Sequence, residues 1–156
     1  MIRLDQMFKD CYSPEYQLMC SNPLKHRYTA LGLIIRGDVA FSDVNRNIKK
    51  MRDELDMVYW NREGFKYGIC NAPPLNQPYS LLCLANNTCL SENFSEMVER
   101  FNKLYKRKAH VHHYKEFLDE GHFAETLDAT VNLIQRYEEL EKLEKPEKSF
   151  RVKPFI

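Results

Sequence analysis

The sequence predicts an α/β (α+β) fold, a two-layer sandwich with a mixed sheet followed by a C-terminal helical hairpin. The first observation is that short apolar runs of strand length alternate with segments whose apolar residues recur every three or four positions. The second is that two long segments after residue 92 keep this helical spacing. We expect an α/β sheet domain at residues 1–90, the helical hairpin at residues 91–145 and a mobile tail at residues 146–156.

The N-terminal part of the chain predicts a short helix, a loop and a strand. Residues 4–11 carry apolar side chains at helical spacing, and Pro14 and Pro23 then indicate a loop. Residues 28–35 form a continuous apolar run that ends before Gly37, which is typical of a strand covered on both faces. We expect this strand to be central in the sheet.

The middle of the chain predicts one amphipathic helix and three further strands. Ser42 can cap a helix at residues 43–55, and residues 57–60 and 65–70 have strand patterns. Three prolines then exclude regular structure before residues 79–85, a second apolar run that predicts a buried strand. The inner face of the helix carries Val44, Ile48, Met51 and Leu55, and its outer face carries Asn45, Arg46, Lys49 and Arg52.

The last third of the chain predicts the two helices of the hairpin. The first is expected to begin at Glu92, to run through a basic cluster and a group of histidines, and to stop before Gly121. The second is expected to follow from His122 and to end at Pro146. The apolar stripe of the first helix is Phe94, Met97, Val98, Phe101, Leu104 and Tyr105, and that of the second is Phe123, Leu127, Val131, Ile134 and Tyr137.

Composition narrows the class of protein. A net charge of +1 gives the whole chain no attraction to nucleic acid or membrane, and no apolar run reaches the roughly 20 residues that a membrane span needs. The N-terminus also lacks the apolar region of a secretory signal, so we expect a cytoplasmic protein. The five cysteines are odd in number and form no Cys-x-x-Cys pair, which favours reduced, mostly buried thiols.

Residues that could carry chemistry are few. The five glycines are isolated, so no loop can wrap a phosphate with consecutive backbone amides, and we expect no nucleotide site and no catalysis in this chain. His110 and His113 are spaced to approach a common metal ion, but no carboxylate or cysteine nearby completes a ligand set, which favours packing or hydrogen bonding. Acidic neighbours make the basic residues between 100 and 108 more typical of a solvated face than of a phosphate-binding helix.

The chain resembles the tubulin family. The run Lys106-Arg107-Lys108-Ala109, with His112 and Tyr114 after it, is similar to the segment near the C-terminus of tubulins, and its His-x-His-His-Tyr form is most like the epsilon class. The resemblance extends over roughly residues 4–140. Further matching residues are Gln6-Met7-Phe8, Arg27-Tyr28, Arg36-Gly37, Cys70 with Pro73-Pro74, Leu84-Ala85-Asn86-Asn87-Thr88-Cys89, Phe123, Glu125 and Tyr137.

This resemblance implies a tubulin C-terminal domain-like fold, in which residues 1–90 correspond to the intermediate domain. Tubulins carry their phosphate loop and catalytic carboxylate in segments that precede the Gln6 position. The resemblance therefore implies a fragment or truncated gene product with no cofactor and no enzyme activity of its own, GTP belonging to a full-length parent. It implies a cytoskeletal role at centrioles and basal bodies, with other tubulin-family subunits or centriolar proteins as partners.

Two surfaces are candidates for these contacts. In tubulins, the helix that corresponds to residues 43–55 lies where one subunit meets the next longitudinally, so its outer face is the first candidate. The hairpin is the second. Its candidate residues are Lys106, Arg107, Lys108, His110, His112, His113 and Tyr114. Two other functions stay open: the regulatory part of a GTPase, and a small basic-helix adaptor for RNA or phospholipid.

Overall fold

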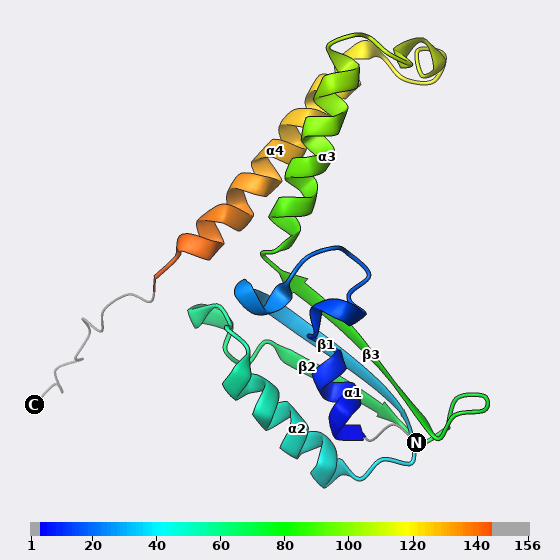
Figure 1. Cartoon of the computed structure of the whole chain (residues 1–156), viewed down its shortest axis with the longest axis vertical. Helices are drawn as coiled ribbons and strands as arrows, with labels where there is room; N and C mark the ends of the chain where they lie inside the picture. Colours follow the sequence, from blue (N-terminus) through cyan, green and yellow to red (C-terminus); the bar gives the residue numbers. More distant parts are fainter. Residues whose placement is uncertain (1–3, 145–156) are drawn as a thin grey trace, which may run out of the picture.

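The computed structural model describes residues 4–144 and has the predicted α/β architecture. A sheet with two helices comes first, and a pair of long helices follows (Figure 1). The helices and strands are α1 (Leu4–Asp10), β1 (Tyr28–Gly37), α2 (Phe41–Glu54), β2 (Phe65–Cys70), β3 (Tyr79–Asn87), α3 (Leu90–Tyr105) and α4 (Glu120–Lys142). Short 3₁₀ turns are η1 (Pro14–Tyr16), η2 (Pro23–Lys25), η3 (Tyr59–Asn61) and η4 (Val111–His113).

The sheet is mixed and has the strand order β2-β1-β3, so the central position of β1 is confirmed. β1 and β2 are parallel, with Leu33 opposite Tyr67, and α2 supplies the crossover between them. β1 and β3 are antiparallel, with Leu33 opposite Cys83. The strand edge of β3 away from β1 is thus one rim of the sheet.

The core lies between one face of this sheet and the helices α1 and α2. Leu31, Leu33 and Ile35 alternate along β1 and point into it, because successive side chains of a strand face opposite ways. They meet Phe8 from α1 and the predicted inner face of α2, of which Val44 is fully buried. Burial of each large side chain contributes about 1.5–3 kcal/mol, so this one layer accounts for much of the stability of the sheet domain.

The opposite face of the sheet is open. Ile34 of β1 is 48% exposed, and Leu82 and Leu84 of β3 are 53% and 59% exposed. The prediction of strands covered on both faces is therefore wrong for the described residues: β1 is covered on one face, and β3 is a half-exposed edge strand rather than a buried one. An all-apolar run indicates double cover only when a second layer is present, and α1 and α2 both lie on the same side (Figure 1).

Two local predictions are corrected. Residues 57–60 form no strand: Met57 makes a single parallel bridge with Tyr28, and the chain then turns through η3. α2 begins one residue before Ser42, with Ala40 at its cap position, so Ser42 lies inside the first turn. The remaining strand and helix predictions up to residue 87 agree with the structure within a few residues.

α3 and α4 run side by side and project from one end of the sheet (Figure 1). Stacked rings hold them together: the ring centroid of Phe123 on α4 lies 6.3 Å from that of Phe101 and 5.7 Å from that of Tyr105, both on α3. The predicted inner face of α4 is confirmed, since Ile134 is buried and the other four members are partly buried. The predicted stripe of α3 is partly wrong, because Met97 and Leu104 are about half exposed.

The structure places the last strand residue at Asn87 and the first residue of α3 at Leu90, next to the predicted domain boundary at residue 90. The predicted tail at residues 146–156, with Pro146, lies outside the described residues. Among residues 4–144, no helix combines the length and the apolar character needed to cross a bilayer.

Candidate functional site

The outer face of α2 presents the first group of predicted interface residues, all of them exposed. Arg46 forms ion pairs of 3.0 Å with Asp5 and with Asp43, and Arg52 forms one of 3.0 Å with Glu63. These arginines therefore already have carboxylate partners inside the chain.

The two remaining members of this face differ from the arginines. Asn45 accepts a hydrogen bond of 3.1 Å from the hydroxyl of Tyr67 on β2. Lys49 is the one cation of the group with no ion pair among residues 4–144. Lys49 is thus the side chain of this face that is most available to a partner's carboxylate.

Asp5 links the short helix α1 to this surface. Asn47 of α2 donates a 2.7 Å hydrogen bond to Asp5, and that bond, together with the Arg46 guanidinium, lowers the pKa of Asp5. The same carboxylate raises the pKa of Arg46. Arg46 therefore has a structural role, because it fastens α1 to α2.

The second group of predicted residues lies in the connection between α3 and α4, and the prediction that a helix runs through it is wrong. α3 ends at Tyr105, within the basic cluster, so that Lys106, Arg107 and Lys108 come after the helix. The backbone then takes positive φ angles of 51° at Lys108 and 61° at His110, a conformation that ends a helix. η4 follows, anchored by the buried Val111.

The side chains of this connection, which we call the hairpin tip (residues 106–114), are mostly exposed. His112 and His113 have ring centroids 3.9 Å apart, and His110 stacks on His113 at 6.0 Å. Tyr114 lies edge-on to Phe123 of α4 at 6.1 Å. Among the described residues no group of three or more histidine, cysteine or carboxylate side chains is placed to hold a metal ion.

Charges at the tip are partly balanced. Lys108 and Lys115 form ion pairs of 3.2 and 3.0 Å with Glu120, the first residue of α4. Lys115, followed by Lys108, lowers the pKa of Glu120. Lys106 and Arg107 are exposed and have no ion pair within residues 4–144, so they are the free cations of the tip.

A shallow apolar groove of about 370 Å³ lies between α3 and α4 next to the tip. Met97 and Phe101 line it from α3, and Leu118 and Phe123 line it from the other side. The exposure of Met97, which the helical pattern did not predict, is explained by its position in this groove.

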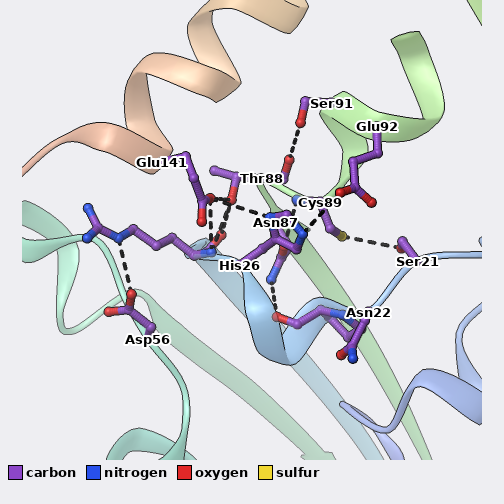
Figure 2. Close-up of polar contacts among 12 residues, drawn as sticks. Ser21, Asn22, His26, Asp56, Asn87, Thr88, Cys89, Ser91, Glu92 and Glu141 are labelled. Carbon is purple, nitrogen blue, oxygen red and sulfur yellow. Dashed lines mark hydrogen bonds and ion pairs between the residues drawn. The ribbon is translucent and has the colours of Figure 1, made fainter. Parts of the chain in front are cut away.

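The structure also contains a site that the sequence patterns did not predict, a polar junction where the base of the hairpin meets the sheet (Figure 2). Thr88, whose exposed fraction is 1%, accepts a 3.0 Å hydrogen bond from the Arg27 amide and donates one to the Glu141 carboxylate. The Arg27 side chain binds Asp56 at 3.1 Å and also donates to the carbonyl of Leu143.

His26 and Asn87 complete this junction (Figure 2). The His26 ring nitrogens lie 3.6 Å from Glu92 of α3 and 3.7 Å from Glu141 of α4. Asn87 donates a 3.0 Å hydrogen bond to the Pro23 carbonyl and accepts one of 2.8 Å from the Cys89 amide. Polar residues between a strand and a helix are a capping signal, and this signal could have identified Asn87 and Thr88.

These elements define a layered α+β domain that presents charged and apolar surfaces suited to binding other proteins. A family model described as Tubulin C-terminal domain matches residues 1–99 of the chain. The chain belongs to the tubulin family.

Its similarity to tubulins extends through the hairpin. The chain is 45% identical over 141 residues to the tubulin epsilon chains of Homo sapiens and Mus musculus, which covers 89% of this chain and 30% of each relative. It is 31% identical over 148 residues to the tubulin alpha chain of Zymoseptoria tritici, covering 88% of this chain and 33% of that one. The resemblance to tubulins, and to the epsilon class in particular, is confirmed. The chain spans about 30% of the length of the epsilon chains it matches.

Proposed function

We propose that this chain provides subunit-interaction surface in an epsilon-tubulin-like protein of the centriole and basal body, within the cytoplasmic cytoskeleton. The observation that carries this proposal is the identity of 45% to tubulin epsilon chains, against 31% to a tubulin alpha chain over a similar length. Other tubulin-family subunits, or centriolar proteins, are the partners that this assignment favours. The role is one of surface rather than of catalysis.

The outer face of α2 is the surface that we assign to the next subunit. It is exposed along its length, and Lys49 offers a charge that no carboxylate of the described residues neutralises. A basic side chain of this kind accelerates association with an acidic partner and selects against a basic one. The hairpin tip, with Lys106 and Arg107 free, is the second candidate surface.

A charge reversal separates these two surfaces. Arg46→Glu is unsuitable as a test because it would place a carboxylate beside Asp5 and Asp43 and detach α1. Lys49→Glu removes only the free charge, and Lys103→Glu, at an exposed position on α3, is the matched control. Both changes should leave the free energy of unfolding within about 0.5 kcal/mol of the parent chain.

Capture of purified tubulin-family subunits by the immobilised 156-residue chain is the measurement. We expect Lys49→Glu to reduce capture about tenfold, which corresponds to about 1.4 kcal/mol of binding free energy, and Lys103→Glu to have no effect. Undiminished capture by Lys49→Glu would refute the assignment to α2. Loss of capture by Lys106→Glu with Arg107→Glu would instead place the interface at the tip.

GTP binding and hydrolysis belong, in this proposal, to a full-length parent and not to this chain. The basis is chemical: consecutive backbone amides are needed to surround a phosphate, and the five glycines are isolated. Titration calorimetry of the purified chain with GTP and magnesium should give no saturable heat. Binding in the micromolar range would contradict the proposal and favour a chain that itself regulates a GTPase.

A basic-helix adaptor for RNA or phospholipid is the less favoured function. Its premise was a helix that carries the whole basic cluster, but α3 ends at Tyr105, so only Arg100 and Lys103 of that cluster lie on it. Lys108 is also paired with Glu120. Binding to RNA or anionic vesicles that falls steeply with salt would reverse this preference.

A further inference from the structure

Three cysteine thiols line one surface groove of about 600 Å³, between β3 and the segment that follows α1. Cys11, Cys83 and Cys89 contribute to its wall, and each is a free cysteine. Cys11 and Cys83 are partly buried, and both pack against the hydrophobic core at the side of the groove. Cys20 and Cys70 are exposed and do not line the groove, so the prediction of mostly buried thiols holds fully only for Cys89.

Cys11 and Cys83 line the same groove and shift each other's pKa, although 72 positions separate them in the sequence. A side-chain hydrogen bond between the two thiols is the largest cause of the shift in each pKa. This hydrogen bond, together with burial, raises the pKa of Cys11. The same hydrogen bond lowers the pKa of Cys83, while burial opposes the shift. Of the two thiols, Cys83 therefore loses its proton more readily than Cys11.

We propose that Cys11 and Cys83 form an oxidisable dithiol, a modification site at which hydrogen peroxide converts the two thiols to a disulfide that joins the end of α1 to β3. The groove that both thiols line, their packing against the same core and their partial exposure carry the proposal. Cys83 is the nucleophile, and Cys11 is the resolving thiol.

The reaction balances with hydrogen peroxide as the only oxidant. The Cys83 thiolate attacks one peroxide oxygen, the O–O bond breaks, and hydroxide leaves and takes up the proton that Cys83 released. Cys83 is now a sulfenic acid. The Cys11 sulfur attacks the Cys83 sulfur, the S–O bond breaks, and the hydroxyl group leaves with the Cys11 proton as a second water. Two thiols and one peroxide thus give one disulfide and two waters.

The disulfide would change how the first helix is held. In the reduced chain α1 is joined to α2 by the pairing of Asp5 with Arg46 and Asn47, and to the core by Phe8. A covalent bond to β3 would add a second attachment, at the opposite end of α1 and at the rim of the sheet. In the oxidised chain the end of α1 would therefore be covalently attached to β3, where the reduced chain has only packing contacts.

The test uses the full 156-residue chain with Cys20→Ser and Cys70→Ser, which removes the two exposed thiols. After treatment with hydrogen peroxide, non-reducing peptide mapping should show a Cys11–Cys83 link that a reductant removes. Adding Cys11→Ser, which keeps a hydrogen-bond donor beside Cys83, should stop the link and let a sulfenic-acid probe label Cys83. Adding Cys83→Ser instead should leave Cys11 labelled about tenfold more slowly.

A second measurement needs no variant at the two sites. Phenylarsine oxide joins two neighbouring thiols through its arsenic atom and releases one water, so the chain lacking Cys20 and Cys70 should bind one equivalent and lose alkylation at both Cys11 and Cys83. The proposal is overturned if peroxide links Cys83 to Cys89, if Cys11 and Cys83 oxidise separately to sulfinic acids, or if one arsenical leaves either thiol free to alkylate.

Discussion

Replacing Thr88 by valine removes the hydroxyl group that joins the sheet to the hairpin and keeps the shape of the side chain. Thr88 accepts a hydrogen bond of 3.0 Å from the Arg27 amide and donates one to the carboxylate of Glu141. Both partners remain after Thr88→Val, and the Arg27 amide then has only Glu141, at 3.5 Å. The substitution therefore removes the hydroxyl that lies between the Arg27 amide and the Glu141 carboxylate.

The size of the effect follows from these bonds. A hydrogen bond between neutral groups contributes about 0.5–1.5 kcal/mol net, and one to a charged group about 1.5–3 kcal/mol. The Glu141 side chain is 35% exposed and can recover part of its loss from water, so we expect a total of about 2 kcal/mol. For a chain of this size that lowers the melting temperature by about 4–8 °C.

Thermal unfolding followed by circular dichroism measures the shift, and hydrogen exchange locates it. The slow amides at the C-terminal end of α4 should exchange faster in Thr88→Val, while those of β1 should change least. Thr126→Val is the matched control, because the Thr126 hydroxyl is exposed and donates only to the His122 carbonyl one turn away. If Thr88→Val melts like Thr126→Val and exchange in α4 is unchanged, the junction does not hold the hairpin.

Three further outcomes are expected. Gly37→Ala should lower the free energy of unfolding by about 2 kcal/mol or more, because φ there is +121° and the added Cβ would clash with the backbone oxygen of Pro78. Gly121→Ala, in open space on α4, is the control and should be neutral or stabilising; chemical denaturation measures both. Because the pKa of Asp5 is lowered in the folded chain, its stabilisation should be complete above pH 3.8 and disappear as pH falls through the folded value, so the difference in melting temperature between the parent chain and Asp5→Asn should vanish in acid. Ile34→Thr with Leu82→Thr should reduce binding of an apolar dye and self-association, and unchanged dye binding would contradict the open sheet face.

The spacing of apolar residues correctly predicted the buried faces of two helices that pack against other described parts of the chain. The inner faces of α2 and α4 were predicted well, because each packs against a surface that the same pattern requires. The burial of β3 was predicted wrongly, because an apolar run reports what its side chains prefer and not whether a second layer is present. The runs at Leu82 and Leu84 therefore look the same in an open sheet and a covered one.

The candidate sites show a different limit. No glycine or proline lies between residues 92 and 120, so nothing in the sequence indicated that α3 ends at Tyr105; the stop comes from positive φ at Lys108 and His110. The polar junction joins Arg27 to Glu141, 114 positions apart, and local patterns contain no information on such a pairing. The position of the α2 face, by contrast, follows from helical geometry alone.

The way the hairpin is attached gives it the mechanics of a lever. α4 has 23 residues and is about 34 Å long, so a rotation of about 5° at its base moves the tip by about 3 Å. The two helices are held together by the stacking of Phe123 on Phe101 and Tyr105, whereas the base is held by hydrogen bonds that water can replace. A load on the tip therefore acts as a torque on Thr88 and Glu141, and the arm pivots at its base before its helices separate. We therefore expect the angle between the hairpin and the sheet to change more easily than the length of the hairpin.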